Sequence, residues 1–474
     1  MRGAYDYDLL VIGSGPAGEK GAAQAAYFGK KVALIEREEV LGGASVNTGT
    51  LPSKTLRETA LYLSGFRQRG LHGVDLSLSR AATVDEFLYR EQRVIAEERK
   101  RIADNLYSHK IVHIKGDARF VDPHTLAVRR PGWPESHVSA EFILVATGSS
   151  PFRPPMYPFD HAHVYDSDEI VRVDFIPKNL AVIGGGVIGS EYACLFAALG
   201  VKVMLVESRP TLMGFLDGEM SLLLAERMKS LGIDLRLGET VEEVTLLARG
   251  VALGLKSGAR FEADIVLVAA GREANTATLD LAKAGLVAGK RGALEVDERY
   301  RTKVPHIYAA GDCIGFPALA ATSMEQARIA AVSMFGYNYK ESLAPILPYG
   351  IYTIPETSMA GETEETLQAK KVPYVAGYAR FNDNARGKII GEAYGRLKLL
   401  FGVDDQKLLG VHVIGEGATE LIHIGLAAML QNANADLFIR MCFNYPTLSE
   451  TYKYATYDAL GKMKTVAAIQ SGQT

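Results

Sequence analysis

One glycine pattern occurs twice in this sequence, and the repeat limits the folds that the chain can adopt. In DLLVIGSGPAG and again in NLAVIGGGVIG, an apolar run leads into three spaced glycines, and a second apolar run then ends at a glutamate. In both copies 23 positions separate the first glycine from that glutamate. A single pattern of this kind arises by chance in glycine-rich loops, whereas two matched copies indicate a duplicated unit. The residues are Gly13, Gly15, Gly18 and Glu36, then Gly184, Gly186, Gly189 and Glu207.

Each copy is typical of a strand, a tight turn, a helix and a second parallel strand that together bind a dinucleotide. The first glycine permits the turn, the second lets the backbone approach a pyrophosphate, and the third lets helix and strand pack closely. The free amides and partial positive charge at the helix N-terminus favour the phosphates. The glutamate at the end of the second strand accepts hydrogen bonds from the adenosine ribose. The sequence therefore predicts two dinucleotide-binding units.

Two further apolar segments mark where each unit ends. AEFILVATG closes at Gly148 and ADIVLVAAG closes at Gly271, and both are expected to be strands that return to the sheet. The first unit is longer because it also contains VDEFLYREQRVIAEERKRIADNLYSHK, whose apolar residues recur at helical spacing and whose basic residues alternate with glutamates. We interpret that segment as a helix with a solvated face. The proline-rich SSPFRPPMYPFD is expected to be a stiff connector, and alternating strands followed by helices are expected from Ile346 onward.

Composition excludes several classes of function. The chain has 474 residues, of which 48% are hydrophobic, so it is expected to be globular with two or three domains. Its formal charge is -3, so it is expected to bind neither nucleic acid nor an anionic membrane. No apolar stretch approaches the roughly 20 residues that span a bilayer, and the N-terminus lacks secretory features, which favours the cytoplasm. No spacing of Cys or His indicates a metal site. Cys194, Cys313, Cys442, His412 and His423 are expected to be buried packing residues.

Four stretches together resemble the flavoprotein disulfide reductase family, which includes glutathione reductase and lipoamide dehydrogenase. They are the two glycine patterns, the loop GGASVNTGTLPSK at residues 42–54 and IYAAGDC at residues 307–313, and the resemblance runs essentially from end to end. The resemblance implies an α/β fold with two Rossmann-like domains, one that binds FAD and one that binds NAD(P). It also implies an α+β C-terminal domain through which two subunits form a homodimer, and assembly into higher oligomers stays possible. The implied boundaries are 1–148 with 272–345 for FAD, 149–271 for NAD(P) and 346–474 for the interface.

The resemblance also assigns the residues that bind nucleotides. Asp312 matches the aspartate that contacts the ribityl and pyrophosphate region of FAD, and the helix that follows is expected to direct its N-terminus at the flavin pyrimidine. The implied FAD residues are Gly13, Gly15, Gly18, Glu36, Gly43, Thr48, Lys54, Gly148, Asp312 and Ala320. The implied NAD(H)/NADP(H) residues are Gly184, Gly186, Gly189, Glu207, Arg209 and Gly271.

Three positions depart from the chemistry of disulfide reductases. The two redox cysteines of the family correspond to Ser45 and Thr50, and the histidine of its C-terminal His-Pro-Thr motif corresponds to Tyr445, while Glu450 is retained. A serine hydroxyl cannot attack a disulfide, because it is neither acidic enough nor redox-active. A tyrosine with an ordinary pKa near ~10 is a poor proton shuttle for thiols at neutral pH. Thiol-disulfide exchange is therefore not expected.

The residues that the family uses for hydride transfer are present. Lys54 and Glu191 match the pair that the family places beside flavin N5. Without the resemblance, Lys54 could equally be a solvated residue at the start of a helix, and Glu191 a carboxylate on the face of a helix. VNTGTLPSKTLRE and FNYPTLSETY are similar to the soluble pyridine nucleotide transhydrogenase branch of the family. This implies ping-pong transfer of hydride from NADPH to FAD and then to NAD in one pocket. The implied catalytic residues are Lys54, Glu191, Tyr445 and Glu450, the last two supplied by the partner subunit.

Two questions stay open at the level of sequence. Glu207 favours the free ribose hydroxyls of NAD, and Arg209 either binds the 2'-phosphate of NADP or is an ordinary surface arginine. An NAD(P)H dehydrogenase that reduces quinones or dyes would use the same loop, and a non-catalytic nucleotide-sensing flavoprotein would bind the same cofactors. A thiol-disulfide enzyme would need an external thiol carrier.

Overall fold

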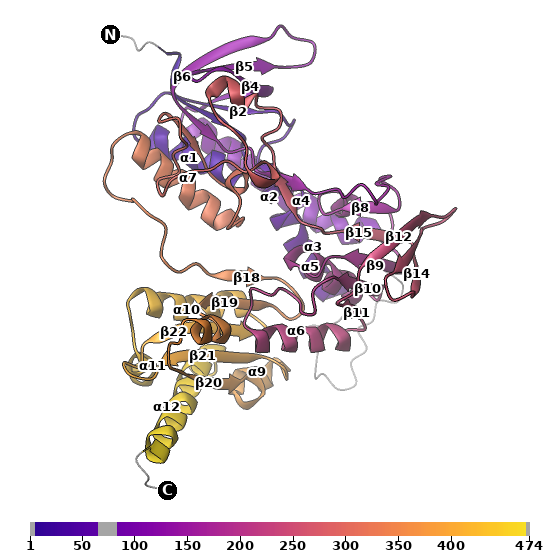
Figure 1. Cartoon of the computed structure of the whole chain (residues 1–474), viewed down its shortest axis with the longest axis vertical. Helices are drawn as coiled ribbons and strands as arrows, with labels where there is room; N and C mark the ends of the chain where they lie inside the picture. The colour runs from indigo at the N-terminus through magenta and orange to yellow at the C-terminus, as the bar shows by residue number, and fades with distance from the viewer. Residues whose placement is uncertain (1–4, 65–82, 471–474) are drawn as a thin grey trace.

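The computed structural model describes residues 5–64 and 83–470, and the side chains of residues 465–470 are left out of that description. The chain is elongated, with the N-terminal sheet at one end, a second sheet in the middle and a third at the opposite end (Figure 1). In addition to the helices and strands given below, the structure has short 3₁₀ turns at Ile170–Arg172 (η2), Leu281–Ala284 (η3), Lys290–Gly292 (η4), Asp312–Ile314 (η5), Phe381–Asp383 (η6) and Leu448–Glu450 (η7).

The first sheet is built around the first glycine pattern. Its parallel strands lie in the order β3-β2-β1-β6-β17, and β5 and β4 extend β6 as antiparallel neighbours. Helices α1 and α7 pack closely against each other. The last three residues of β6 and all of β2 except Glu36 are apolar, because they are buried on both faces. The bounds are Tyr7–Ile12 (β1), Pro16–Tyr27 (α1), Val32–Glu36 (β2), Val112–Lys115 (β3), Asp117–Asp122 (β4), Thr125–Arg129 (β5), Ser136–Val145 (β6), Ile307–Ala309 (β17) and Ala320–Met334 (α7).

The second sheet repeats the same arrangement around the second pattern. Its strands are parallel in the order β11-β10-β9-β15-β8, and an antiparallel meander, β12-β13-β14, is attached. The two predicted return strands are β6 and β15, and each pairs in parallel with the strand that precedes the glycines, which confirms that prediction. The bounds are Val164–Asp166 (β8), Asn179–Ile183 (β9), Val187–Ala198 (α5), Lys202–Glu207 (β10), Gly218–Ser230 (α6), Asp234–Leu237 (β11), Val241–Leu246 (β12), Val251–Leu255 (β13), Arg260–Ala263 (β14) and Ile265–Val268 (β15).

The chain crosses between these two units twice, and the two crossings pair with each other. β7 (Ser149–Pro151) opens the proline-rich segment and forms a two-stranded antiparallel ribbon with β16 (Arg272–Ala274). Arg272 reinforces this contact, because its guanidinium donates to Ser149 and pairs with Asp168 at 2.8 Å. The predicted connector therefore forms a strand only at its start, and a turn follows at residues 155–156.

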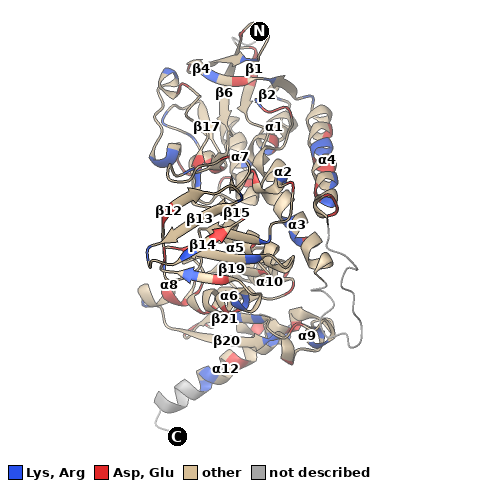
Figure 2. Ribbon diagram, turned by 90° about the vertical axis from the view of Figure 1, so that its right-hand side faces the viewer, with Lys and Arg blue, Asp and Glu red and all other residues tan. Residues whose placement is uncertain are grey.

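The charged helix predicted within the first unit is α4 (Val84–Ser108). A capping box between Thr83 and Glu86 begins it, and stretches coloured for basic and acidic residues alternate along its ribbon (Figure 2). Pairs such as Arg93 with Glu97 are four residues apart and exposed, which confirms the solvated face. Glu91 is the exception, since it lies on the buried side; burial raises its pKa to about 7 despite the opposing charges of Arg172 and Arg99.

The C-terminal unit is an antiparallel sheet, β18-β19-β22-β21-β20, packed against α10, α11 and α12. The side chains of β21 alternate, so that Leu397, Leu399 and Phe401 join the apolar core with Tyr452 of α12. The bounds are Tyr349–Ile351 (β18), Thr357–Gly361 (β19), Glu364–Ala369 (α8), Tyr374–Arg380 (β20), Ala385–Ile389 (α9), Arg396–Gly402 (β21), Leu408–Ile414 (β22), Ala418–Leu430 (α10), Ala435–Arg440 (α11) and Thr451–Gln470 (α12).

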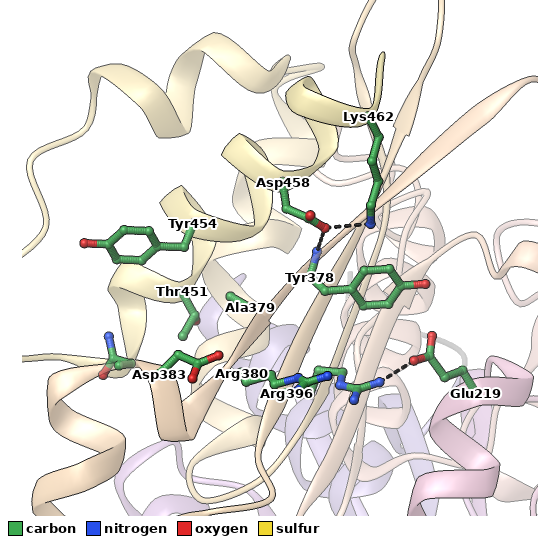
Figure 3. Close-up of a pocket in the computed structure, with 11 residues that line it drawn as sticks. Glu219, Tyr378, Ala379, Arg380, Asp383, Arg396, Thr451, Tyr454, Asp458 and Lys462 are labelled. Carbon is green, nitrogen blue, oxygen red and sulfur yellow. Dashed lines mark hydrogen bonds and ion pairs between the residues drawn. The ribbon is translucent and has the colours of Figure 1, made fainter. Parts of the chain in front are cut away.

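Helix α12 lies along the outer strand of this sheet, β20 (Figure 3). Asp458 accepts the backbone N–H of Tyr378 at 2.9 Å, and Lys462 donates to the carbonyl of Ala376 at 2.9 Å. Asp458 and Lys462 also pair with each other at 2.7 Å. A cavity of about 480 Å³ opens beside this contact, and its lining residues include none of the residues that the sequence assigned to nucleotide binding or catalysis.

Burial of the cysteines and histidines matches the sequence prediction only in part. Cys194, Cys313 and His412 are buried as expected, and burial raises the pKa of both thiols to about 12. Cys442 and His423 are exposed, so the prediction of packing roles for these two was wrong. Among the described residues, no helix has both the length and the apolar character needed to cross a membrane.

Candidate active site

The first glycine-rich turn is tightly constrained by backbone contacts. Gly13 follows β1 with a φ of 102°, and a Cβ at this position would lie 2.4 Å from the carbonyl oxygen of Ala146. A Cβ at Gly18 would lie 1.8 Å from the carbonyl oxygen of Gly13, so only glycine lets α1 pack this closely on β1. Gly15 is the N-cap residue of α1. Gly13 and Gly18 therefore meet the steric constraints that the pattern predicts for the turn and for the packing of helix on strand.

The second turn repeats this geometry almost contact for contact. Gly184 has a φ of 110°, and a Cβ there would meet the carbonyl of Ala269 at 2.5 Å. A Cβ at Gly189 would lie 1.9 Å from the carbonyl oxygen of Gly184. Gly186 precedes α5, and its Cβ would meet no atom within 4 Å. The backbone at Gly186 is thus open to a ligand, as a pyrophosphate site requires.

Each glutamate at the end of the second strand is held by the turn of its own unit. Glu36 accepts hydrogen bonds from the backbone N–H and the hydroxyl of Ser14, at 2.8 and 2.6 Å. Glu207 accepts the backbone N–H of Gly185 at 2.7 Å, and Arg209 forms two hydrogen bonds with its carboxylate at 3.0 Å. Burial opposes ionisation of Glu207, but Arg209 and the two backbone amides outweigh it and lower the pKa to about 2. Both acids are therefore held in place beside the glycine turn of their own unit.

The helices expected to face phosphates or flavin are among several described helices that begin without a side-chain cap. No side chain caps α1, α5 or α7, whereas Thr83, Asp217 and Thr363 cap α4, α6 and α8. The first amides of an uncapped helix have no partner within the helix, so they remain available to an anionic or polar group. Ala320 is the first residue of α7, the helix that the sequence predicts to direct its N-terminus at the flavin.

The loop at residues 42–54 folds back on the first turn. Gly42 donates to the hydroxyl of Ser14 at 2.9 Å, and a Cβ at Gly43 would lie 2.9 Å from the Cα of Gly15. The loop contains the short helix α2 (Gly43–Asn47) and leads into α3 (Thr50–Leu63). The loop therefore brings Gly43 against the first glycine turn, and Thr48 follows as the C-cap residue of α2.

Two buried hydroxyls, one in this loop and one beside Gly13, have no hydrogen-bond partner within the described residues. They are the Oγ1 atoms of Thr48 and Thr147, and Thr147 adjoins Ala146, whose carbonyl contacts Gly13. A buried hydroxyl without a partner is costly, so these two atoms call for a polar ligand. Asp312 begins η5 and accepts a hydrogen bond from Ser149 at 2.8 Å. The unpartnered hydroxyls, the uncapped helices and the glycine contacts together fit FAD. The remaining glycines, Gly148 and Gly271, both have positive φ and follow β6 and β15.

Lys54 and Glu191 meet although 137 positions separate them. Lys54 on α3 donates to Glu191 on α5, with 2.5 Å between Nζ and Oε2. The other carboxylate oxygen accepts the backbone N–H of Tyr352 at 2.9 Å, and Nζ lies 5.0 Å from the centre of the Tyr352 ring. Glu191 is 7% exposed, whereas Lys54 is 25% exposed. The expected pair is therefore formed, and Tyr352 joins it from the segment between β18 and β19.

No thiol lies at the positions that the family uses for disulfide exchange. Ser45 belongs to α2 and Thr50 begins α3, one turn before Lys54. Tyr445 is 76% exposed and precedes a cis proline, and Glu450 lies 3.5 Å from the amide of Asn384. Within the described part of the chain, no hydrogen bond or ion pair links Tyr445 or Glu450 to Lys54 or Glu191. One chain thus forms the lysine pair but does not bring the C-terminal residues to it.

Sequence reasoning missed Ser14, Tyr352 and Arg57, which support the predicted residues. Ser14 occupies the variable position of the glycine pattern, where a hydroxyl is compatible with the turn but not required by it. Arg57 is buried on α3 and donates to the carbonyl of Thr353 at 3.1 Å. Arg57 follows Lys54 by three residues, and this helical spacing was the available signal that both lie on one face.

The fold and this site define a class of oxidoreductases that bind two dinucleotides in successive Rossmann-like domains. The sequence profile of the pyridine nucleotide-disulphide oxidoreductases matches residues 7–327, and the profile of their dimerisation domain matches residues 347–456. The chain belongs to the pyridine nucleotide-disulphide oxidoreductase family.

Relatives with similar sequences cover nearly the whole chain. A protein of Mycobacterium bovis named soluble pyridine nucleotide transhydrogenase is 45% identical over 460 residues, which is 97% of this chain and 98% of the relative. The protein of the same name from Colwellia psychrerythraea is 41% identical, and the match covers 98% of this chain and 100% of that relative. Among solved structures, LpdA of Mycobacterium tuberculosis superposes with a TM-score of 0.87 at 26% identity. It covers 95% of this chain and 99% of its own.

The HOCl-induced flavoprotein disulfide reductase RclA of Escherichia coli, described as a Cu(II) complex, superposes with a TM-score of 0.86 at 26% identity. That match covers 95% of this chain and 99% of RclA.

The close contact at Gly18 gives a first prediction. Replacing Gly18 with alanine is expected to push α1 away from β1, because the added Cβ would meet the Gly13 carbonyl at 1.8 Å. Overpacking of this kind costs about 1–3 kcal/mol, and because the distortion falls on the turn expected to bind FAD, we expect FAD affinity to fall about fivefold to 150-fold. The ratio of flavin to protein absorbance after purification measures the effect. Gly461→Ala is the matched control, since its Cβ would meet nothing within 4 Å. Full flavin content in Gly18→Ala would contradict the packing argument.

Proposed function

We propose that this protein transfers hydride between NADPH and NAD through bound FAD. The proposal rests chiefly on one observation: the Lys54–Glu191 pair is formed in a loop that has Ser45 and Thr50 in place of the redox cysteines. The names of relatives at 40–45% identity over nearly the full chain support the same activity. The glycine contacts, uncapped helices and unpartnered hydroxyls support FAD at the first turn and a nicotinamide nucleotide at the second.

FAD, when bound, supplies a carrier that accepts a hydride from one nicotinamide and gives it to another. Lys54 contributes a positive charge that is held in place by Glu191, and such preorganised charge lowers the barrier to transfer. The nucleotide is oriented by Glu207 and by the free amides at the start of α5, and this placement accounts for much of the rate. Because Ser45 and Thr50 cannot accept electrons, the nucleotides exchange in one pocket and the kinetics are ping-pong.

The choice between nucleotides rests in this proposal on Arg209. Its side chain is half exposed and already paired with Glu207, so the arginine lies beside the acid that contacts the adenosine ribose. We propose that Arg209 binds the 2'-phosphate of NADPH while Glu207 serves the ribose hydroxyls of NAD.

Arg209→Ala is accordingly expected to raise the KM for NADPH about tenfold and to leave the KM for NAD within about twofold. Loss of one charge-assisted hydrogen bond costs about 1.5–3 kcal/mol, which corresponds to a factor of about ten or more. Steady-state kinetics with each nucleotide make the measurement. Arg260→Ala, at an exposed arginine of the same unit, is the control. Equal KM values for NADPH in the Arg209 variant and the wild type would leave the 2'-phosphate without its proposed partner.

The domain assignment is also a proposal. Residues 1–148 with 272–345 would form the FAD domain, 149–271 the NAD(P) domain and 346–474 the interface domain. The return of β17 to the first sheet supports this division, and so does the β7–β16 ribbon at the crossing. The match of residues 347–456 to a dimerisation domain supports a homodimer in which the partner subunit brings Tyr445 and Glu450 to the flavin. We propose a cytoplasmic protein that acts on nicotinamide nucleotides and binds neither nucleic acid nor a membrane.

An anaerobic experiment with separated half-reactions tests the proposed function. The holoenzyme is bleached with NADPH, NADP⁺ is removed by gel filtration, and NAD⁺ is then added. Return of the flavin colour with formation of one NADH per flavin is expected. A flavin that stays bleached with NAD⁺ but recovers with a quinone would instead indicate an NAD(P)H dehydrogenase. A flavin that NADPH never bleaches would indicate a nucleotide-sensing protein.

A further inference from the structure

The carboxylate of Glu191 is held from two sides that belong to different parts of the chain. One oxygen receives Lys54 from α3 at 2.5 Å, and the other receives the N–H of Tyr352 at 2.9 Å. Tyr352 lies between β18 and β19 of the C-terminal sheet. Both oxygens of Glu191 are therefore occupied, so this buried acid has a single well-defined orientation.

The ring of Tyr352 makes the second contact with the pair. Lys54 Nζ lies over this ring, 5.0 Å from its centre, within the range of a cation–π interaction. The ring is half-buried, and its desolvation raises the pKa of the phenol, opposed by a hydrogen bond with Thr419. One residue thus holds the acid through its backbone and covers the ammonium with its side chain.

The segment that carries Tyr352 is itself fixed to α3. Arg57 donates to the carbonyl of Thr353 at 3.1 Å and pairs with Glu356 at 3.4 Å. Glu356 also accepts the hydroxyl of Thr419 at 2.8 Å, which ties the segment to α10. Arg57, Thr353 and Glu356 are all buried. Because Lys54 and Arg57 are one helical turn apart, α3 contacts the segment at two successive points.

We propose that Tyr352 is a positioning residue for hydride transfer, which holds the Lys54 ammonium against Glu191 and restricts its access to water. This inference rests on the proposed function. Tyr352 acts through Lys54. Removing the Tyr352 side chain therefore changes the position of the Lys54 ammonium but leaves its positive charge in the site. The arrangement also makes the lysine pair depend on docking of the C-terminal sheet against α3 and α5.

A substitution series at Tyr352 separates ring electrostatics from packing. Tyr352→Phe keeps the aromatic face and is expected to behave like the wild type, whereas Tyr352→Leu keeps apolar volume and loses the face. Cation–π contacts contribute about 0.5–2 kcal/mol, so the leucine variant is expected to bleach about two- to thirtyfold more slowly with saturating NADPH. The measurement is the rate constant of the single-turnover bleaching. A folding defect would lower the amplitude of the bleaching rather than its rate constant. Tyr374→Leu, in the same sheet, is the control.

A second readout does not depend on activity. Acylation of Lys54 by an amine-reactive ester, followed by peptide mass spectrometry of the holoenzyme, reports how firmly the ammonium is held. Faster acylation is expected in Tyr352→Leu than in the wild type and Tyr352→Phe. Equal acylation and bleaching rates in all three proteins would overturn the inference. If acylation follows the expected order but NADPH-reduced enzyme does not reduce NAD⁺, the positioning role stands and the proposed function fails.

Discussion

Replacing Lys54 with methionine is expected to slow bleaching of the flavin by NADPH about 100-fold or more. The substitution keeps much of the volume of the side chain and removes the charge that Glu191 and Tyr352 hold in place. Removal of a single preorganised group that stabilises developing charge typically costs a factor of about 10²–10³. Glu191 would also become a buried carboxylate with only the Tyr352 amide as a partner. Anaerobic stopped-flow absorbance measures the rate constant directly.

The control for Lys54→Met is Lys256→Met, which removes an exposed lysine from the turn between β13 and β14. Flavin content must be compared in both variants, so that loss of FAD is not mistaken for loss of catalysis. Glu191→Gln tests the same pair from the other side, and we expect a smaller effect because the ammonium remains. Bleaching at the wild-type rate in Lys54→Met would remove the lysine from the proposed mechanism.

Replacing Lys398 with methionine is expected to destabilise the protein by about 3–5 kcal/mol. Lys398 is fully buried on β21, yet it contacts three carboxylates: Asp217 at 2.8 Å, Glu219 at 3.2 Å and Glu364. Without the ammonium, these acids would be left close together, with Asp217 only 1% exposed. The three acids could in principle hold a cation, but the lysine ammonium already occupies the space between them. The cluster therefore joins α6 to the C-terminal sheet.

Thermal and urea unfolding of the holoenzyme measure this loss, with Lys407→Met as the matched control. Lys407 pairs with Asp405 at 3.1 Å, but both side chains are half exposed, and exposed pairs contribute about 0–1 kcal/mol. We expect the midpoint of unfolding to fall clearly in Lys398→Met and hardly at all in Lys407→Met. Similar unfolding midpoints in the two variants would show that the buried Lys398 cluster contributes no more to the free energy of unfolding than the exposed Lys407 pair.

The pH dependence of this cluster follows from the two shifted groups. Burial opposes ionisation of Asp217, but His412, Lys398 and the amide of Glu364 outweigh it and lower the pKa below its usual 3.8. The carboxylates raise the pKa of Lys398 above its usual 10.5 despite burial. Stability from Asp217 is therefore complete above pH 3.8 and is lost as the pH falls through the lowered value. Stability from Lys398 is complete below pH 10.5 and is lost as the pH rises through the raised value. The contribution of this cluster to the stability of the wild type should therefore be constant across neutral pH, as unfolding measurements at several pH values would show.

The local units of the fold were predictable because their signals are local. The turn at Gly13, helix α1 and the acid at Glu36 lie within one short stretch, and backbone sterics alone require glycine there. The same holds for Gly184 and Glu207. The strands that return to each sheet were also predictable, since uninterrupted apolar runs are typical of parallel strands buried on both faces.

Contacts between distant segments could not be predicted in the same way. Arg57 and Thr353 are 296 positions apart, and Lys398 and Asp217 are 181 positions apart. Each contact depends on how the C-terminal sheet docks, which no local pattern encodes. The error at His423 has a simpler cause: α10 buries Leu421, Ile422 and Gly425, and the helical turn places His423 on the other side. Apolar neighbours in sequence therefore did not imply burial.

The contact between α12 and β20 bears on how copies of this chain associate. An outer strand with free N–H and C=O groups invites another chain to add a strand, which leads to open-ended growth. Here Asp458 and Lys462 occupy an N–H and a C=O of that strand within the same chain. Extension of the sheet across this border by a second copy of the chain is thereby disfavoured.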